Sequence, residues 1–235
     1  MISSCSPPPL TPHAPVLLRL AGSTSMQPLL RDLAAAYSEQ HQYVSFDFSA
    51  VGSAAGIELL RRGNADLALV SRPLRPEEEY DNQTGKRLLA YTIIARDGIA
   101  IVVNESNPAD SLTLYQVRKI FEGQILSWAE LGSPAGDVLV VSREDGSGTR
   151  DVFEELVMRG YRVTTTALIM PGSDAMRDFV AAHEGAIGYL SMGYLGTGVT
   201  ALALDNVLPN RETVEDGSYP LTRPFLLVSL PDPAA

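Results

Sequence analysis

Three times in this chain an apolar run ends in a turn of small and hydroxyl-bearing residues, and an amphipathic stretch follows the turn. The three segments read LAGSTSMQPL, SAVGSAAGIEL and SREDGSGTRDVF, at residues 20–29, 49–59 and 142–153. A strand that runs through a short turn into a helix is the repeating unit of α/β folds. The repeat therefore predicts a sheet with helices packed against it.

The hydrophobic spacing of the other segments agrees with that fold. After the first turn, one face of a helix is predicted from Met26, Leu29, Leu30, Leu33 and Tyr37. The runs VLLRLAG, ADLALVS and DVLVVSR are short and apolar, as buried strands are. With 235 residues the chain is long enough for two lobes that each bury a core.

The three turns themselves predict a binding site for an anion. The first amide N–H groups of a helix lack partners within the helix, and the helix dipole is positive there. In α/β sheets such turns lie at the carboxyl ends of the strands, where ligands bind. Hydroxyl donors stand on all three turns, namely Thr24, Ser25, Ser53, Ser147 and Thr149.

Other residues extend this predicted site. Gly148 keeps the third turn open, and Arg143 upstream of it offers an oxyanion a bidentate fork. Ser71 and Arg72 end another apolar run and add a hydroxyl and a charge. Such residues also serve capping and turn geometry alone, so no single turn decides the matter. Neither glycine-rich signature of a nucleotide site accompanies the turns.

Charge and residue counts bear on the partners. The formal net charge is −10, whereas nucleic-acid binding relies on basic surface, so we expect no nucleic-acid partner. A small anion stays compatible with this charge, because salt screens distant surface groups. The three histidines, His13, His41 and His183, are scattered, so we expect no metal site, and we expect no cofactor.

Five segments follow one another in an order shared with one known family. They read AGSTSMQPLL, GSAAGIELL, ADLALVSRPL, SREDGSGTRDVFEEL and GAIGYLSMGYL. In this order they resemble the landmarks of the PstS-like phosphate-binding proteins, which are extracytoplasmic solute-binding components of ABC phosphate importers. The resemblance covers residues 16–229, and R-x-D-G-S-G-T is its most specific part.

The resemblance implies a type II periplasmic-binding-protein fold, in which two α/β lobes joined by crossover strands close on the ligand. The expected crossovers are IIARDGIAI and GAIGYLSMG. Lobe one is then expected at residues 16–96 and 192–235, and lobe two at 97–191, after a disordered tether at 1–15. The family also implies a monomer without catalytic activity that delivers inorganic phosphate to a membrane ABC permease.

The resemblance also assigns roles to single residues. It implies that the anion contacts seven positions, namely Thr24, Ser25, Ser53, Arg143, Ser147, Gly148 and Thr149. Arg72 is expected at the cleft mouth, and Ser71 stands where other members have an aspartate. That carboxylate accepts a hydrogen bond from protonated phosphate and repels fully ionised sulfate, whereas serine repels nothing. Sulfate or another tetrahedral oxyanion therefore remains an alternative ligand.

The first residues bear on localisation. Ile-Ser-Ser-Cys resembles the bacterial lipobox, in which the cysteine, here Cys5, becomes the lipidated first residue. No charged and apolar segment precedes it, so a random terminus that contains a cysteine remains the alternative. We expect an extracytoplasmic protein, in the periplasm or at the cell surface, with a lipid anchor at Cys5 as one option.

Two further functions stay open. A sensory module that reports the anion level to a membrane partner would use the same closure of two lobes. A phosphatase-like serine hydrolase would use Ser25 or Ser147 as its nucleophile, and it would need a general base beside that serine. No histidine neighbours a glycine-flanked serine in the sequence, and no G-x-S-x-G elbow is present.

Overall fold

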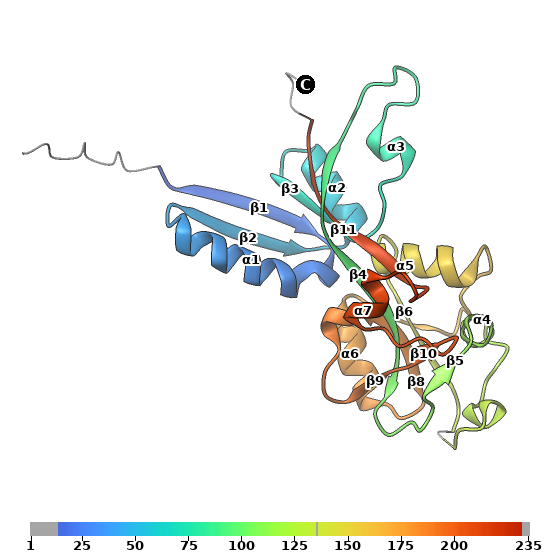
Figure 1. The fold of residues 1–235 in the computed structure, drawn as a ribbon. Helices are drawn as coiled ribbons and strands as arrows, with labels where there is room; N and C mark the ends of the chain where they lie inside the picture. The colour runs from blue at the N-terminus through green and yellow to red at the C-terminus, as the bar shows by residue number, and fades with distance from the viewer. Residues whose placement is uncertain (1–13, 135, 232–235) are drawn as a thin grey trace, which may run out of the picture.

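The computed structural model describes residues 14–134 and 136–231. Their elements form two groups on either side of two long strands, β4 (Ala90–Asn104) and β11 (Thr222–Ser229), which cross the middle of the molecule (Figure 1). One sheet path connects both groups in the order β2-β1-β3-β11-β4-β8-β6-β7, and β9 also pairs with β4. This arrangement confirms the predicted fold class, two α/β lobes joined by crossing strands.

Lobe one is the smaller group. In chain order its elements are β1 (Val16–Gly22), the 3-10 turn η1 (Thr24–Met26), α1 (Gln27–Gln40), β2 (Val44–Ala50), α2 (Ser53–Arg61), β3 (Leu67–Val70) and α3 (Pro76–Glu79). Strand β1 lies between β2 and β3 and is parallel to both. The carboxyl ends of the three strands therefore meet at one edge, where η1 and α2 begin.

Lobe two contains the remaining elements. They are β5 (Ser111–Leu112), α4 (Leu114–Phe121), η2 (Trp128–Leu131), β6 (Leu139–Arg143), α5 (Gly148–Phe153), η3 (Glu154–Met158), β7 (Leu168–Met170), α6 (Ser173–Ala182), β8 (Ala186–Ser191), η4 (Met192–Tyr194), β9 (Val199–Ala201), β10 (Ala203–Leu204) and α7 (Arg211–Glu215). Its core surrounds a stack of Phe153 on Tyr189, whose ring centroids are 4.0 Å apart. Beside them Trp128 is fully buried and donates its indole N–H to the carbonyl of Gly185.

The structure corrects one expected crossover and the lobe boundary. GAIGYLSMG forms β8, which pairs with β4 and β6 inside lobe two, whereas the second crossing strand is β11. Residues 199–221, expected in lobe one, pack in lobe two: β9 pairs with β4, and Val214, Tyr219 and Leu221 join the cluster around Trp128. An apolar run shows that a strand is buried, but it does not show which neighbour the strand will pair with.

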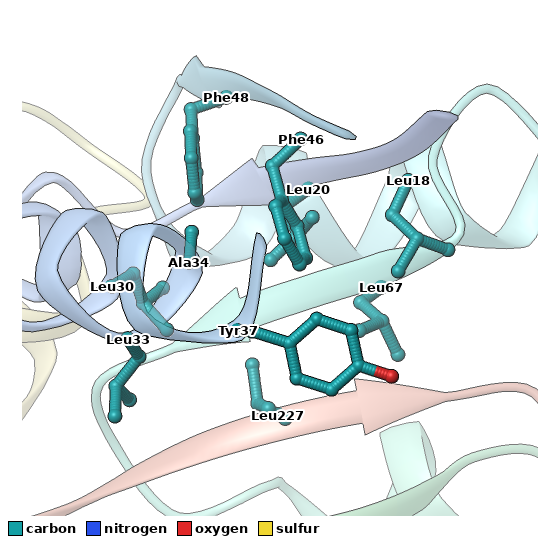
Figure 2. Close-up of a pocket in the computed structure, with 10 residues that line it drawn as sticks. All are labelled: Leu18, Leu20, Leu30, Leu33, Ala34, Tyr37, Phe46, Phe48, Leu67 and Leu227. Atoms are coloured by element: carbon teal, nitrogen blue, oxygen red, sulfur yellow. The ribbon is translucent and has the colours of Figure 1, made fainter. Parts of the chain in front are cut away.

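Helix α1 covers one face of the lobe-one sheet incompletely. Leu30 is its one buried hydrophobic residue, whereas Leu33 and Tyr37 are nearly half exposed. A hollow of about 310 Å³ remains between the helix and the sheet (Figure 2). Its lining is almost entirely apolar and comprises Leu18, Leu20, Leu30, Leu33, Ala34, Tyr37, Phe46, Phe48, Leu67 and Leu227.

The described residues include no helix with the length and apolar character of a membrane-spanning segment. In the same residues, no group of three or more histidine, cysteine, aspartate or glutamate side chains is arranged to hold a metal ion. Cys5 and the residues around it lie outside the described part, so the lipobox stays a prediction.

Candidate functional site

The three predicted turns come together between the two lobes. Thr24 and Ser25 lie in η1, just after the end of β1, and Ser53 is the first residue of α2. Thr149 lies in the first turn of α5, which belongs to lobe two. The hydroxyl oxygens of Ser25 and Thr149 are 2.8 Å apart, although 124 positions separate the two residues in the chain. All of these side chains are buried. At this point the two lobes therefore meet through hydroxyl groups, which we call the hydroxyl cluster.

Ser53 and Ser71 extend the hydroxyl cluster within lobe one. Ser53 Oγ accepts a hydrogen bond from the backbone N–H of Ser71 at 3.2 Å and lies 3.4 Å from Ser71 Oγ. Ser23 Oγ donates to Ser71 Oγ at 2.8 Å. Ser71, which stands at the position of the expected carboxylate, is thus held in place by two neighbouring serines.

Gly148 brings the start of α5 against these two serines. A Cβ atom added to Gly148 would collide with the hydroxyl of Ser53 and would lie 2.7 Å from Ser71 Oγ. Glycine is therefore required for the close approach of the two lobes at this point. Ser147 caps the same helix, since its Oγ accepts a hydrogen bond from the backbone N–H of Arg150 at 3.4 Å. The amino end of α5 thus faces the hydroxyl cluster with its backbone.

Arg143 reaches the cluster from the end of β6. It is 1% exposed. Its Nη2 donates to Thr24 Oγ1 at 3.2 Å and its Nη1 donates to Ser173 Oγ at 3.4 Å, so the guanidinium connects the two lobes. The carboxylate of Glu144 accepts from Nε and Nη2, both at 2.8 Å, and balances the positive charge.

Arg72 does not join the hydroxyl cluster. Its Nε donates to Asp151 Oδ2 of lobe two at 2.7 Å, and its Nη1 and Nη2 donate to the two carboxylate oxygens of Glu78 at 2.7 and 2.8 Å. Burial alone lowers the pKa of Arg72, but the facing carboxylates outweigh burial and leave that pKa above its usual value. In this structure the donors of Arg72 are thus engaged in ion pairs, one of which joins the lobes, and its contact with an anion stays a prediction.

Sequence reasoning missed Ser173 as a site residue. Its Oγ lies 3.2 Å from Ser25 Oγ and 3.5 Å from Thr24 Oγ1, across the gap between the lobes. The signal was available, because Ser173 follows β7 and Gly172 and begins α6, so it stands on a fourth turn of the same kind.

A buried ion pair on the crossing strands lies behind the cluster. Arg223 of β11 donates from Nε to Asp97 Oδ2 of β4 at 2.9 Å, and Ser191 Oγ donates to Asp97 Oδ1 at 2.8 Å. Nη1 of Arg223 donates to Thr149 Oγ1 at 2.7 Å. Burial raises the pKa of Asp97 and lowers the pKa of Arg223, against the attraction between them. No sequence motif singled out either residue.

The assembled groups can hold an anion. Hydroxyls and a guanidinium, supplied by both lobes, are hydrogen-bond donors of the kind that recognise an oxyanion. His41 and His183 lie at the ends of α1 and α6, where their rings stack on Tyr37 and Phe179. Neither imidazole is therefore placed to act as a general base for a serine of the cluster.

Comparisons with known proteins agree with this geometry. A sequence model of the PBP superfamily domain matches residues 10–235. A phosphate ABC transporter substrate-binding protein of Clostridium perfringens, solved with bound phosphate, is 38% identical with a TM-score of 0.84. That alignment covers 91% of this chain and 86% of the other. An ABC-type phosphate transport receptor of Vibrio cholerae is 35% identical with a TM-score of 0.72, over 92% and 88% of the two chains.

Curated relatives carry related names. The phosphate-binding protein PstS of Bacillus subtilis is 30% identical over 210 residues, which are 87% of this chain and 67% of the relative. Phosphate-binding protein PstS 2 of Streptococcus pneumoniae is 37% identical over 119 residues, or 51% of this chain. The matched segments thus span about two thirds of the first relative and 38% of the second.

Proposed function

Because the chain belongs to the PstS-like phosphate-binding proteins of the PBP superfamily, we propose that it binds inorganic phosphate between its two lobes. The observation that carries the proposal is the meeting of donors from both lobes, with Ser25 and Thr149 2.8 Å apart. An anion that accepts hydrogen bonds from both sides stabilises the closed arrangement over an open one.

The proposed contacts divide between the lobes. Lobe one contributes the hydroxyls of Thr24, Ser25, Ser53 and Ser71. Lobe two contributes Arg143, Ser147, Gly148 and Thr149, to which we add Ser173 on the evidence of its position. Arg72 is left out of the set, because its donors are already engaged by Glu78 and Asp151.

Delivery follows from the same closure. We propose that the protein is an extracytoplasmic monomer that passes phosphate to a membrane ABC permease, which recognises the closed form. A lipid at Cys5 would hold it at the membrane. The transport role rests on the family, and the names of the relatives support it, whereas the lipid rests on the resemblance of Ile-Ser-Ser-Cys to a lipobox.

Calorimetric titration of anion-stripped protein with phosphate tests the proposal. We expect saturable heat with one site, and we expect Arg143→Gln to weaken binding at least tenfold, because a buried guanidinium fork is lost. Arg211→Gln is the matched control, since Arg211 lies on the surface of lobe two and pairs with Glu215 of the same helix. Absence of heat with wild-type protein would overturn the proposal.

Sulfate is the second candidate ligand, and Ser71 is the observation that favours it. Ser71 is neutral, whereas a carboxylate would repel a fully ionised anion. Titration with sulfate under the same conditions decides between the two. Sulfate binding comparable to phosphate binding would make the protein a general oxyanion binder.

The hydrolase and sensor functions have separate tests. Turnover of a chromogenic phosphate ester that is abolished by Ser25→Ala would identify a hydrolase. Binding without turnover is what we expect, because no histidine of the described residues lies beside a cluster serine. Co-purification with a membrane kinase in place of a permease would identify a sensor.

A further inference from the structure

We propose that Arg223, on the crossing strand β11, is a positioning residue that turns the hydroxyl of Thr149 into a donor toward the bound anion. The inference rests on the proposed function. It assigns to Arg223 an effect on anion affinity that acts through Thr149, in addition to any role in holding the crossing strands together.

The location of Arg223 is the first support. Its side chain is 0% exposed. Nη1 donates to Thr149 Oγ1 of lobe two at 2.7 Å and also approaches the carbonyl oxygen of Ser71, in lobe one, at 3.3 Å. A single nitrogen on the crossing strand thus contacts both walls of the cluster.

The direction of the hydrogen bonds is the second support. A guanidinium only donates, and a hydroxyl has one proton and two acceptor lone pairs. Thr149 Oγ1 must therefore accept from Arg223, and its own proton points elsewhere. In this structure the group available to that proton is Ser25 Oγ at 2.8 Å. An oxyanion between the lobes would receive the same proton.

Arg143 imposes the same direction from the other side of the cluster. It donates to Thr24 Oγ1 and to Ser173 Oγ, so both of these oxygens are acceptors toward the guanidinium. Their own protons must point away from the guanidinium, and an anion between the lobes could receive them as well. Two buried arginines, one in lobe two and one on β11, thus convert neutral hydroxyls into a set of oriented donors.

Asp97 fixes the position of Arg223. Nε lies 2.9 Å and Nη2 lies 2.8 Å from the same carboxylate oxygen, Asp97 Oδ2. The Nη2 contact lacks hydrogen-bond geometry, and within the described residues Nη2 has no hydrogen-bond acceptor. The carboxylate therefore holds one edge of the guanidinium, and Nη1 remains directed at Thr149. Since Asp97 lies on β4 and Arg223 on β11, the pair also connects the two crossing strands.

A double-mutant cycle separates this role from a structural one. Arg223→Lys keeps the charge beside Asp97, but one ammonium cannot reproduce the fork that reaches Thr149 as well. We expect about a tenfold loss of phosphate affinity in the wild-type background. In the Thr149→Val background Arg223→Lys should lower phosphate affinity by less than about threefold, because the hydroxyl that Arg223 orients is absent. In the Thr149→Ser background, which keeps a hydroxyl, Arg223→Lys should again lower phosphate affinity as much as it does in the wild-type background.

Three results would overturn the inference. The first is wild-type phosphate affinity in Arg223→Lys. The second is an equal loss of affinity from Arg223→Lys in the wild-type and Thr149→Val backgrounds. The third is unchanged affinity when Arg223→Lys is added to Thr149→Ser. If Arg223→Lys does not fold, Asp97→Asn replaces it in the cycle, since it keeps the guanidinium but loosens its anchor. The same pattern of losses is then required. Wild-type protein that binds no phosphate would instead defeat the proposed function itself.

Discussion

At the scale of single residues, Glu144 places a negative charge directly beside Arg143. Its carboxylate occupies two donors of Arg143, both at 2.8 Å, and lies next to the position proposed for the anion. We expect Glu144→Gln to strengthen phosphate binding by about threefold to about tenfold, because a like charge is removed from the vicinity of the ligand. Titration at low and high salt measures the effect, which salt should reduce.

Glu184→Gln is the matched control for this change, because Glu184 is exposed in the turn that follows α6. Weaker binding in Glu144→Gln would contradict the prediction. It would mean that the carboxylate serves mainly to hold Arg143 in its rotamer, and that this effect exceeds the repulsion.

Residue types predicted most of the site but not the partners of its charged groups. Hydroxyls on strand-to-helix turns were identified because helix starts and strand ends are visible in the sequence. Arg143 stands at the start of the most specific motif, whereas Arg72 only follows an apolar run, and nothing local showed that the donors of Arg72 would be engaged elsewhere. The difference arises from Asp151, which is 79 positions from Arg72 and meets it only in the folded chain. The ion pair of Arg223 and Asp97 was not predicted for the same reason, since it joins residues that are 126 positions apart in the chain.

At the scale of elements, the amino end of α5 must approach lobe one closely, and Gly148 permits it. Gly148→Ala adds a Cβ that would collide with Ser53 and Ser71. We expect the variant to fold but to close poorly, so that phosphate binding weakens by about tenfold or more. Calorimetry gives the affinity, and small-angle X-ray scattering with phosphate gives the compaction on closure.

Gly196→Ala provides the control, since no atom lies within 4 Å of a Cβ built at that glycine. Normal affinity and normal compaction in Gly148→Ala would show that the lobes close without this contact.

The elements around α5 illustrate what periodicity can and cannot predict. Strand β6, the turn after it and the start of α5 occur where the sequence predicts them. An apolar run, a short stretch of small and polar residues and an amphipathic stretch follow one another there, and each indicates one element. The helix then continues as a π-type turn, Glu154–Met158, which the spacing of apolar residues did not indicate. The pairing of β8 and β9 also depended on distant strands, and the second crossover was therefore misplaced.

At the scale of the whole molecule, the ion pair of Arg72 and Glu78, which stands beside the contact between the lobes, makes stability depend on pH. Burial raises the pKa of Glu78, but hydrogen bonds from Arg72 and from the backbone N–H of Arg75 outweigh burial, so the pKa lies below its usual value. A carboxyl group whose pKa is lowered by folding stabilises the folded state above its unfolded pKa. That contribution is lost as the pH falls through the folded pKa.

We therefore expect Glu78→Gln to lower the free energy of unfolding by about 1 to about 3 kcal/mol near neutral pH. The difference from wild type should shrink as the pH falls below about 4, the usual range of a glutamate. Thermal unfolding between neutral and acid pH measures both effects. Glu77→Gln is the control, because Glu77 is an exposed neighbour on the same short helix. A difference that persists unchanged into acid would contradict the assignment to charge.

The uneven burial of α1 has a consequence for local opening of the chain. Its amino end continues from η1, which is fully buried among the site residues, while the part beyond Leu30 lies over the hollow of Figure 2 with half-exposed side chains. Segments with few buried contacts open at a lower free energy than the core does. Amide protons of the last turns of α1 should therefore exchange with solvent well before those of β4 and β11. Thr24 and Ser25 thus stand at the slowly exchanging end of a helix that frays from the other.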